Sequence, residues 1–511
     1  MIATTEELHL PLLSRSVRRC PRWLWIALAI ASTVCLAGVV TLAGPLHSAI
    51  QIGGDEFFEV NKGLLWAKGF RLYKEVWNDQ PPLHTIMLGM AFRWFGPTIG
   101  VARALAVWFG LLLWAALFSL VKRHSGKVGA FTALACLIAA PQVLMLSVSV
   151  MLEAPAIAVG LCAVWAVFEW EENRHPAMLA FSGLLLAAAM QIKLTAGIVA
   201  PALALQILLA SRGESKLALA LDGLRTLAFW GFAFLASFVA LGFALGESFD
   251  LLWTSHFSSD IVQELNEENN CSFSFQFITD HTEAIWGVAA AVFIAAARRE
   301  WRTVAFPLSM LLTVMAIHLH HRPWWPYYYL HFAVPIAWLT GYAVAGFLGT
   351  DEYPTAGVPL GSTGNRLMAA GLITLLVFSG GSRLVSEVER ILHLPKVEDS
   401  ALLAKMKYYG PNTRWTFADG AGILPFHARL LVIPQLAVIP ATRVWSGRIS
   451  EAEVLALVKR YRPEQLLLTE SKLGVCLNGL AETEYVCVQK SGKSRLFVSK
   501  SIFDSRKGPA R

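Results

Sequence analysis

The feature that most constrains this chain is its succession of long apolar segments. Only 15% of its residues are charged, whereas soluble globular proteins carry about 25%. A helix of about 20 apolar residues crosses the hydrocarbon of a bilayer. We therefore predict a mainly α, polytopic transmembrane helix bundle of about 11 spans. The expected spans are 23–43, 98–121, 127–146, 154–170, 177–191, 195–210, 226–246, 284–297, 303–318, 330–349 and 367–381.

The charges of the loops predict the orientation. With residues 1–22 as a cytoplasmic segment, the loops expected inside contain most of the Lys and Arg residues of the bundle, such as Lys122 and Arg298. The expected outer loop 247–283 contains no Lys or Arg. Basic loops stay on the cytoplasmic side. An odd number of spans then places residues 382–511 outside. The segment before the first span is not a cleavable signal peptide, because the apolar run that follows it is too long.

The first outer loop, residues 44–97, is expected to be structured. Two pieces, 56–69 and 82–95, have apolar residues at helical spacing but are too short to cross a bilayer. We expect both to be helices that lie on the outer membrane surface. Residues 23–381 would then form one transmembrane domain that carries this loop.

The C-terminal part, residues 382–511, is predicted to be a soluble α/β domain. Strands are expected at Trp415–Ala418, Leu430–Ile433, Gln465–Thr469 and Arg495–Ser501, and a helix at Ser450–Tyr461. Ser450 and Glu453 form a capping-box pattern. Cys476 and Cys487 would pair in an oxidising compartment, or would be two buried free thiols. The basic excess of this part favours anionic lipid head groups or a glycolipid over nucleic acid as a partner.

Acidic side chains stand at the expected outer ends of the spans. Asp55 and Glu56 follow the first span directly, and two adjacent carboxylates at a membrane edge can provide a general base. The alternative is that Asp55 only caps the helix at 56–69. Glu153 lies between two spans in apolar surroundings, where it is either a cap before Pro155 or part of a site.

Three further groups fall on the same outer side. Gln80 and His84 belong to the stretch Asn78–His84, where the prolines fit a helix start. Lys193 lies in an outer turn, and either extends to the interface or binds an anion such as phosphate. His321, Arg322 and Tyr328 lie in a His-Arg-aromatic segment. Its aromatic residues are typical of an interfacial belt, whereas its basic residues suit phosphate.

A metal site is the less favoured interpretation. His320 and His321 are adjacent, which places them poorly for binding one ion together. The residues therefore indicate no particular cofactor, and leave a divalent cation open. Carboxylates that accept a proton, beside cations that hold an anionic leaving group, suit group transfer from a phosphate-activated donor.

The order of these motifs resembles the GT-C glycosyltransferases. The resemblance rests on Gly54-Asp55-Glu56, then Gln80-Pro81-Pro82-Leu83, Glu153 and Lys193, within residues 20–380. The most similar group is family 39-like, with bacterial aminoarabinose transferases and protein O-mannosyltransferases. It implies a polyprenyl-phosphate sugar donor and an inverting transfer of a hexose or pentose on the outer face of the membrane.

The resemblance also implies roles for individual residues. Asp55 would be the base, assisted by Glu56, and Glu153 would match a second outer acidic position. Lys193 would hold the donor phosphate, together with Arg322, His321 and Tyr328. Gln80 stands where some relatives have Lys, so Gln80 and His84 are assigned to positioning the acceptor or the loop.

Two other classes of protein are alternatives to a glycosyltransferase. A secondary transporter or flippase would place charges near the bilayer midplane and show repeated halves, which this chain does not. A receptor or scaffold would leave the acidic pair unexplained. The expected partners are the lipid-linked donor, membrane lipids and a lipid, glycan or protein acceptor. The expected location is a bacterial cell (inner) membrane, with the C-terminal domain in the periplasm.

Overall fold

The structure is a computed structural model of the whole chain. It describes residues 45–257, 279–320, 324–349, 362–420, 422–445 and 447–507. The predicted first span at 23–43 lies outside the described residues, as do His321 and Arg322.

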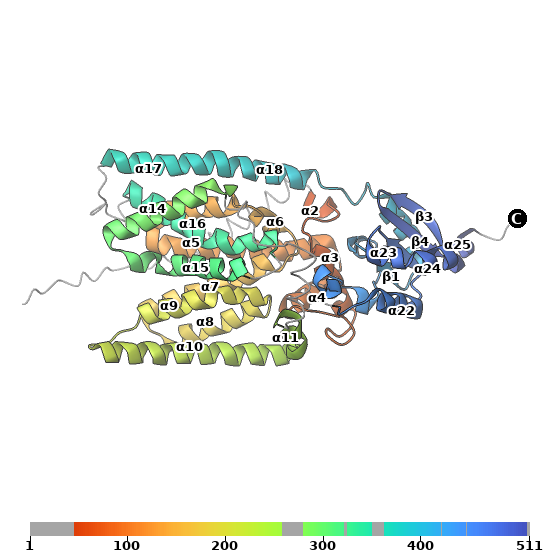
Figure 1. Cartoon of the computed structure of the whole chain (residues 1–511), viewed down its shortest axis with the longest axis horizontal. Coiled ribbons are helices and arrows are strands. Elements are labelled where there is room, and N and C mark those ends of the chain that lie inside the picture. Colours follow the sequence, from red (N-terminus) through yellow and green to blue (C-terminus); the bar gives the residue numbers. More distant parts are fainter. Residues whose placement is uncertain are drawn as a thin grey trace, which may run out of the picture.

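A bundle of long helices forms one end of the molecule, and helix α16 lies at its centre (Figure 1). The apolar window of α16 is completely buried, and α16 packs against α5, α14 and α15. The bundle consists of α5 (Ile99–Ile138), α6 (Val143–Val148), α7 (Glu153–Asn173), α8 (Pro176–Met190), η1 (Leu194–Val199), α9 (Ala200–Leu209), α10 (Lys216–Leu245), α11 (Phe249–Phe257), α14 (Thr282–Arg298), α15 (Trp301–His320), η2 (Pro326–Tyr328), α16 (Tyr329–Leu348), α17 (Ser362–Leu375), η3 (Leu376–Gly380) and α18 (Gly381–Leu392).

Six helices among the described residues are long and apolar enough to cross a membrane. They start at Ile99, Glu153, Lys216, Trp301, Pro326 and Thr363. The predicted spans at 177–191 and 195–210 correspond to shorter apolar helices, and that at 284–297 corresponds to α14. The membrane-helix character of the chain is confirmed, whereas the number of spans stays a prediction.

Two neighbouring predicted spans differ from the observed helices. Residues 98–121 and 127–146 belong mostly to α5, which is interrupted at Gly126, where φ is 66° and ψ is −173°. A residue with a side chain rarely adopts this conformation, so glycine suits the break. The second part ends at Ile138 rather than near residue 146. Pro141 and the positive φ of Gln142 (66°) follow, and they separate α5 from the short helix α6.

Three helices form the predicted outer loop, between the bundle and the C-terminal part (Figure 1). They are α2 (Pro45–Ser48), α3 (Glu56–Ala67) and α4 (Leu83–Phe95), so the expected helices at 56–69 and 82–95 are confirmed within two residues. Helix α3 packs against α4 and against α20 of the C-terminal part. Its charged residues Glu59 and Lys62 are buried.

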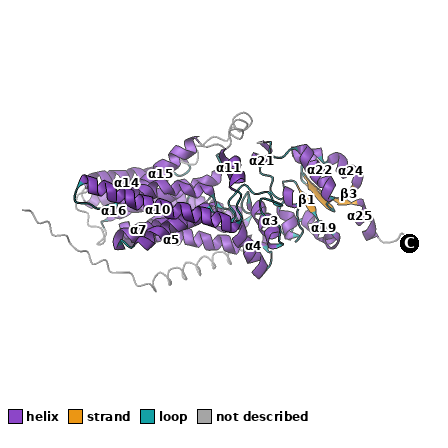
Figure 2. Ribbon diagram, turned by 90° about the horizontal axis from the view of Figure 1, so that it is seen from below, coloured by secondary structure: helices purple, strands orange, loops and turns teal. Residues whose placement is uncertain are grey.

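The strands are confined to the C-terminal end of the molecule (Figure 2). They form one sheet in the order β1-β2-β4-β3, in which β1 and β2 are parallel and the other pairs antiparallel. The elements are α19 (Ala401–Tyr409), η4 (Gly410–Asn412), β1 (Thr416–Ala418), α20 (Ile423–His427), η5 (Pro434–Leu436), α21 (Ala441–Trp445), α22 (Glu451–Tyr461), β2 (Gln465–Leu468), α23 (Lys472–Cys476), α24 (Asn478–Glu484), β3 (Tyr485–Ser491), β4 (Ser494–Ser499) and α25 (Lys500–Lys507).

Most of the predicted elements of this part are observed. The capping box of Ser450 and Glu453 is present at the start of α22. The expected strand at Leu430–Ile433 is reduced to one bridge between Thr416 and Val432, and β3 was not predicted. Cys476 and Cys487 are free thiols.

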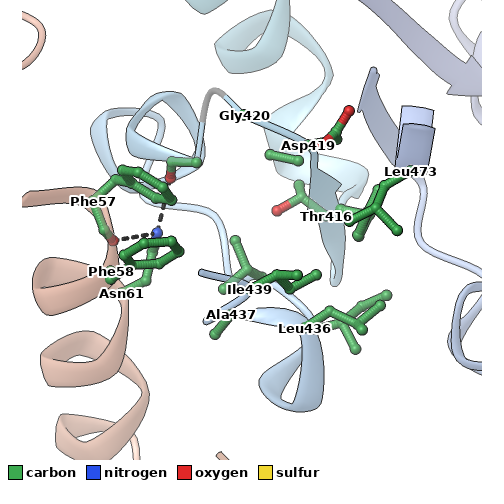
Figure 3. A pocket seen from close by; sticks show the side chains of 15 residues that line it. Phe57, Phe58, Asn61, Thr416, Asp419, Gly420, Leu436, Ala437, Ile439 and Leu473 are labelled. Carbon is green, nitrogen blue, oxygen red and sulfur yellow. Dashed lines mark hydrogen bonds between the residues drawn. The ribbon is translucent and has the colours of Figure 1, made fainter. Parts of the chain in front are cut away.

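The outer helices and the C-terminal part share one hydrophobic core. Val60 and Leu64 of α3 and Phe92 of α4 belong to the same buried cluster as Leu403 and Phe426. The rings of Phe92 and Phe426 are 5.4 Å apart. A cavity of about 130 Å³ remains along this contact, between Phe57 and Phe58 of α3 and Asp419 after β1 (Figure 3). The C-terminal part is therefore packed onto the outer helices and is not merely tethered to them.

Candidate active site

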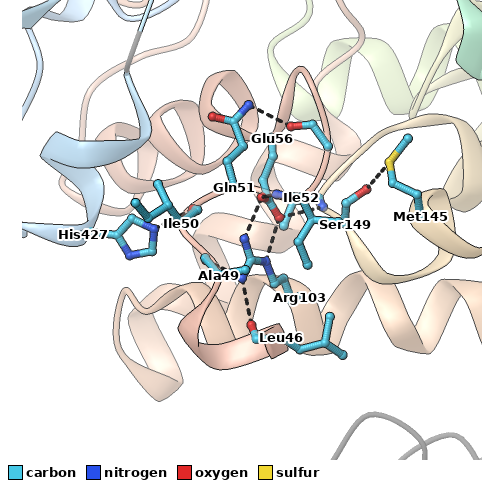
Figure 4. Close-up of polar contacts among 12 residues, drawn as sticks. Leu46, Ala49, Ile50, Gln51, Ile52, Glu56, Arg103, Met145, Ser149 and His427 are labelled. Atoms are coloured by element: carbon cyan, nitrogen blue, oxygen red, sulfur yellow. Dashed lines mark hydrogen bonds and ion pairs between the residues drawn. The ribbon is translucent and has the colours of Figure 1, made fainter. Parts of the chain in front are cut away.

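Glu56 is the most completely bound carboxylate of the candidate site. It is the first residue of α3 and is fully buried. Arg103 of α5 donates from Nε to Oε1 at 2.9 Å and from the guanidinium NH2 to Oε2 at 2.8 Å (Figure 4). The backbone amides of Ile52 and Val150 donate to the same carboxylate, at 2.8 and 3.2 Å. Both oxygens of Glu56 are therefore engaged in holding the protein together.

Arg103 fixes the chain that leads to the acidic pair. Its remaining terminal nitrogen donates to the carbonyl oxygens of Leu46 and Ala49, at 2.8 and 2.9 Å. Arg103 was not among the predicted site residues, although it is a lone charge inside the predicted span 98–121. A charge within an apolar span marks a functional or structural partner, so this signal was available.

Asp55 differs from its neighbour. It occupies the N-cap position of α3, but its side chain makes no capping hydrogen bond. Burial and, next in size, the charge of Glu153 raise the pKa of Asp55 to about 6, while the charge of Lys193 opposes the increase. Glu59 and Asp79 add to the negative field. The capping interpretation therefore finds no support in the geometry, and Asp55 is a carboxylate that exchanges its proton near neutral pH.

Glu153 and Lys193 form a buried ion pair beside Asp55. Glu153 begins α7 and Lys193 follows α8, and the Lys193 ammonium contacts Oε1 of Glu153. No described residue donates a hydrogen bond to the buried Oε2 of Glu153. The ammonium also lies over the rings of Tyr327 and Tyr328, at 4.8 and 5.4 Å from their centroids. Aromatic faces attract a cation at such distances.

Glu59, Lys62 and Asn78 form a second buried ionic cluster, of which no residue was predicted to have this role. Lys62 binds Oε1 of Glu59 at 2.8 Å and donates to Oδ1 of Asn78 at 3.0 Å. Burial alone would raise the pKa of Glu59, but Lys62 and His84 lower it to about 2. The pair has the i, i+3 spacing of a helical ion pair, but the sequence does not reveal that both side chains are buried.

Gln80 and His84 are parts of this cluster. Asn78 Nδ2 and the Tyr73 hydroxyl donate to the carbonyl oxygen of Gln80, at 2.7 and 2.8 Å. His84 is buried, with Nδ1 3.7 Å from Oε2 of Glu59. The Leu83 amide, next in the chain, donates to the carbonyl oxygen of Gln191 at 3.0 Å. The turn at 78–83 therefore connects α3 to the turn that carries Lys193.

The structure thus brings Asp55, Glu153, Lys193 and Tyr328 together. Glu56 is the next residue after Asp55. In the described part of the chain, no three His, Cys, Asp or Glu side chains are grouped so as to hold a metal ion. Lys193 supplies the positive charge beside Glu153. The combination is a proton acceptor beside a fixed cation.

Fold comparison finds solved structures that share the fold of this chain. ArnT from Cupriavidus metallidurans in the apo state is similar with a TM-score of 0.62 and 14% identity, over 94% of this chain and 99% of that one. ArnT bound to undecaprenyl phosphate gives 0.61 and 16%, over 94% and 98%. The archaeal oligosaccharyltransferase AglB from Archaeoglobus fulgidus, in complex with an inhibitory peptide and a dolichol-phosphate, gives 0.51 and 12%, over 94% and 75%.

Sequence comparison agrees over part of the chain. Residues 79–245 match the family described as dolichyl-phosphate-mannose-protein mannosyltransferase. No curated protein matches the chain in a sequence search. The expected fold is therefore confirmed, and the resemblance inferred from the acidic pair and the Pro-Pro element agrees with the family match over residues 79–245.

Proposed function

We propose that this protein is a glycosyltransferase that moves a sugar from a polyprenyl-phosphate donor to an acceptor on the outer face of the membrane. The observation that carries the proposal is Asp55, an uncapped carboxylate with a pKa of about 6, beside the buried Lys193–Glu153 pair. The ligands of the similar structures support it, because ArnT was bound to undecaprenyl phosphate and AglB was in complex with a dolichol-phosphate.

The reaction is a displacement with inversion. An acceptor hydroxyl or amine forms a bond to the anomeric carbon while the bond from that carbon to the phosphate oxygen breaks. Asp55 takes the proton of the acceptor, and the polyprenyl phosphate leaves as an anion. A positioned base contributes about 10²–10⁴-fold to the rate. The acceptor is a lipid, a glycan or a protein, and the sugar is a hexose or a pentose.

Lys193 is the proposed binder of the donor phosphate. A preorganised cation stabilises charge that develops on a leaving group. Glu153 holds the ammonium in place in the free protein, and Tyr327 and Tyr328 fix it from the other side. His321 and Arg322, which precede these tyrosines in the sequence, are proposed to contact the same phosphate.

The other predicted residues are proposed to position the site. Both carboxylate oxygens of Glu56 accept hydrogen bonds from Arg103 and backbone amides. Glu56 is therefore proposed to assist Asp55 by fixing the loop that carries it. Gln80 and His84 belong to the turn beside Lys62 and would set the shape of the acceptor side. We further propose a bacterial inner membrane, about 11 spans, a cytoplasmic N-terminus and an extracytoplasmic C-terminal α/β domain.

Transfer of a labelled sugar tests the function. Wild type and Asp55→Asn, purified in the same detergent, would be incubated with radiolabelled polyprenyl-phosphate sugars and a membrane-lipid extract. Asp504→Asn is the matched control, because Asp504 is an exposed carboxylate in the last helix. We expect the label to move with wild type and Asp504→Asn and not with Asp55→Asn. Undiminished transfer by Asp55→Asn would remove Asp55 from the chemistry, and donor transport without transfer by wild type would favour a transporter.

A further inference from the structure

The C-terminal part touches the loop that carries Asp55 at several points that are far apart in the sequence. Residues 48–50 pair with the linker that follows α18. The amide of Ile50 donates to the carbonyl oxygen of Pro395 at 2.8 Å, and that of Val397 to the carbonyl oxygen of Ser48 at 2.7 Å. Ala49 and Lys396 form an antiparallel bridge. The chain that leads to the acidic pair is therefore one strand of a short ribbon.

His427 completes this attachment from the last turn of α20. Its Nε2 donates to the carbonyl oxygen of Ile50 at 2.8 Å (Figure 4). Arg103 holds the preceding carbonyl oxygen, that of Ala49, at 2.9 Å. Two consecutive carbonyl groups before Asp55 are thus held from opposite partners, one in the bundle and one in the C-terminal part.

A second attachment lies on the other side of the acidic pair. Asn61 Nδ2 in α3 donates to the carbonyl oxygen of Gly422 at 2.8 Å (Figure 3). Gly422 packs so closely that a Cβ there would lie 2.7 Å from the ring of Phe57. Asp55 is therefore flanked on both sides by contacts from the C-terminal part, to Ile50 before it and to Phe57 and Asn61 after it.

We propose that the C-terminal part is a working component of the active site, in which His427 is a positioning residue that holds the Asp55 loop. This inference rests on the proposed function of Asp55 as the base. A base must lie within hydrogen-bond reach of the acceptor, and a displacement of about 1 Å can lower the rate about 100-fold. The donor phosphate lies with Lys193, in the bundle, so the contact of His427 should affect turnover and not donor binding.

The test compares full-length His427→Ala, His427→Gln and wild type. Glutamine places an amide donor near the position of Nε2 and should restore the bond to Ile50. We expect His427→Ala to lower kcat about 10-fold or more, with the affinity for undecaprenyl phosphate changed less than about twofold. His427→Gln should recover most of the turnover. His393→Ala is the control, because His393 is exposed and its ring donates a hydrogen bond to the nearby carbonyl of Glu389.

Amide hydrogen exchange provides a readout that does not need the reaction. In His427→Ala, peptides from residues 46–60 should exchange faster, while those of the buried helix α16 stay unchanged, and His427→Gln should restore protection. Unchanged exchange at 46–60 together with wild-type turnover would overturn the inference. An equal loss of protection in α16 would also overturn it, because that result marks general destabilisation.

Gly422→Ala reaches the same contact from the other side, in case His427→Ala does not fold. The φ of Gly422 is −60°, which alanine adopts readily. The added methyl group would press on Phe57, so we expect lower kcat and faster exchange at 46–60. Normal values for both would count against the inference. Failure of the proposed function would appear differently, as absence of transfer by wild type with the exchange pattern intact.

Discussion

Arg103 binds both carboxylate oxygens of Glu56, and neither side chain is more than 2% exposed. A two-pronged bond between a guanidinium and a carboxylate fixes both distance and direction. The pair joins the start of α3 to α5, across 47 residues of sequence. It is one of the contacts that fix the position of Asp55, next in the chain.

Replacing Arg103 should therefore destabilise the protein strongly. Arg103→Ala leaves the Glu56 carboxylate buried without a counter-charge, which costs about 3–5 kcal/mol. The matched control is Arg390→Ala, which removes a partly exposed pair with Glu387 worth about 0–1 kcal/mol. Thermal unfolding in detergent measures both. Equal melting temperatures for the two variants would contradict this account of Glu56.

The transfer rate should depend on pH through Asp55. A general base acts in its deprotonated form, so the rate should rise with pH, with a midpoint near 6, the pKa of Asp55. A rate profile between pH 4 and 9 measures this. A midpoint near 4, the ordinary value for aspartate, would mean that Asp55 is solvated during the reaction.

The same pKa predicts a change in stability. The folded state raises the pKa of Asp55, so it favours the protonated form, and stability is lost as the pH rises from about 4 to about 6. Asp55→Asn removes this loss. We expect the variant to melt at a higher temperature than wild type at pH 7 and to lose its advantage below pH 4. A variant that is less stable than wild type at pH 7 would contradict the burial of Asp55.

Variants of Lys193 and Glu153 should distinguish the effect of this ion pair on stability from its effect on donor binding. Lys193→Met leaves Glu153 buried and unpaired, which costs about 3–5 kcal/mol, whereas Glu153→Gln/Lys193→Met removes both charges and should restore most of the stability. Both variants should lose affinity for undecaprenyl phosphate, because the cation is gone. Melting curves and lipid titrations measure the two effects. Donor binding by the double variant at wild-type strength would assign the phosphate to other residues.

Lys62 and Glu59 should behave as a structural pair. Lys62→Met should destabilise by about 3–5 kcal/mol, and Glu59→Gln/Lys62→Met by much less, because no unpaired charge remains. Donor affinity should stay at the wild-type level in the double variant, since Lys193 is untouched. Loss of donor affinity there would place Lys62 in the phosphate site. Melting and lipid titration again provide the measurement.

Local patterns predicted the elements of this fold well. The helices α3 and α4 follow from apolar residues at helical spacing, and the start of α22 follows from Ser450 and Glu453. The end of α5 was placed too late, because most residues around Gln142 are apolar, although Pro141 was a local signal of the break. Strand β3 has a mixed burial pattern and no regular alternation to reveal it.

The sequence indicated which residues belong to the candidate site, but not which of them contact one another. The order of Asp55, Glu153 and Lys193 along the chain indicated one outer face, and the structure brings them together. Their different tasks depend on tertiary neighbours. Glu56 and Asp55 are adjacent and chemically alike, and only the approach of Arg103 separates them. No local pattern records that approach.

The pairing of residues 48–50 with 395–397 also has a consequence for biosynthesis. The two strands are separated by almost 350 residues, and they meet only after the intervening helices have been inserted into the membrane. A contact between such distant segments forms late, because the whole loop between them must first be closed. The loop that carries Asp55 is therefore completed near the end of synthesis. A chain that stalls on the ribosome before the C-terminal part emerges would have its bundle but not an assembled Asp55 loop.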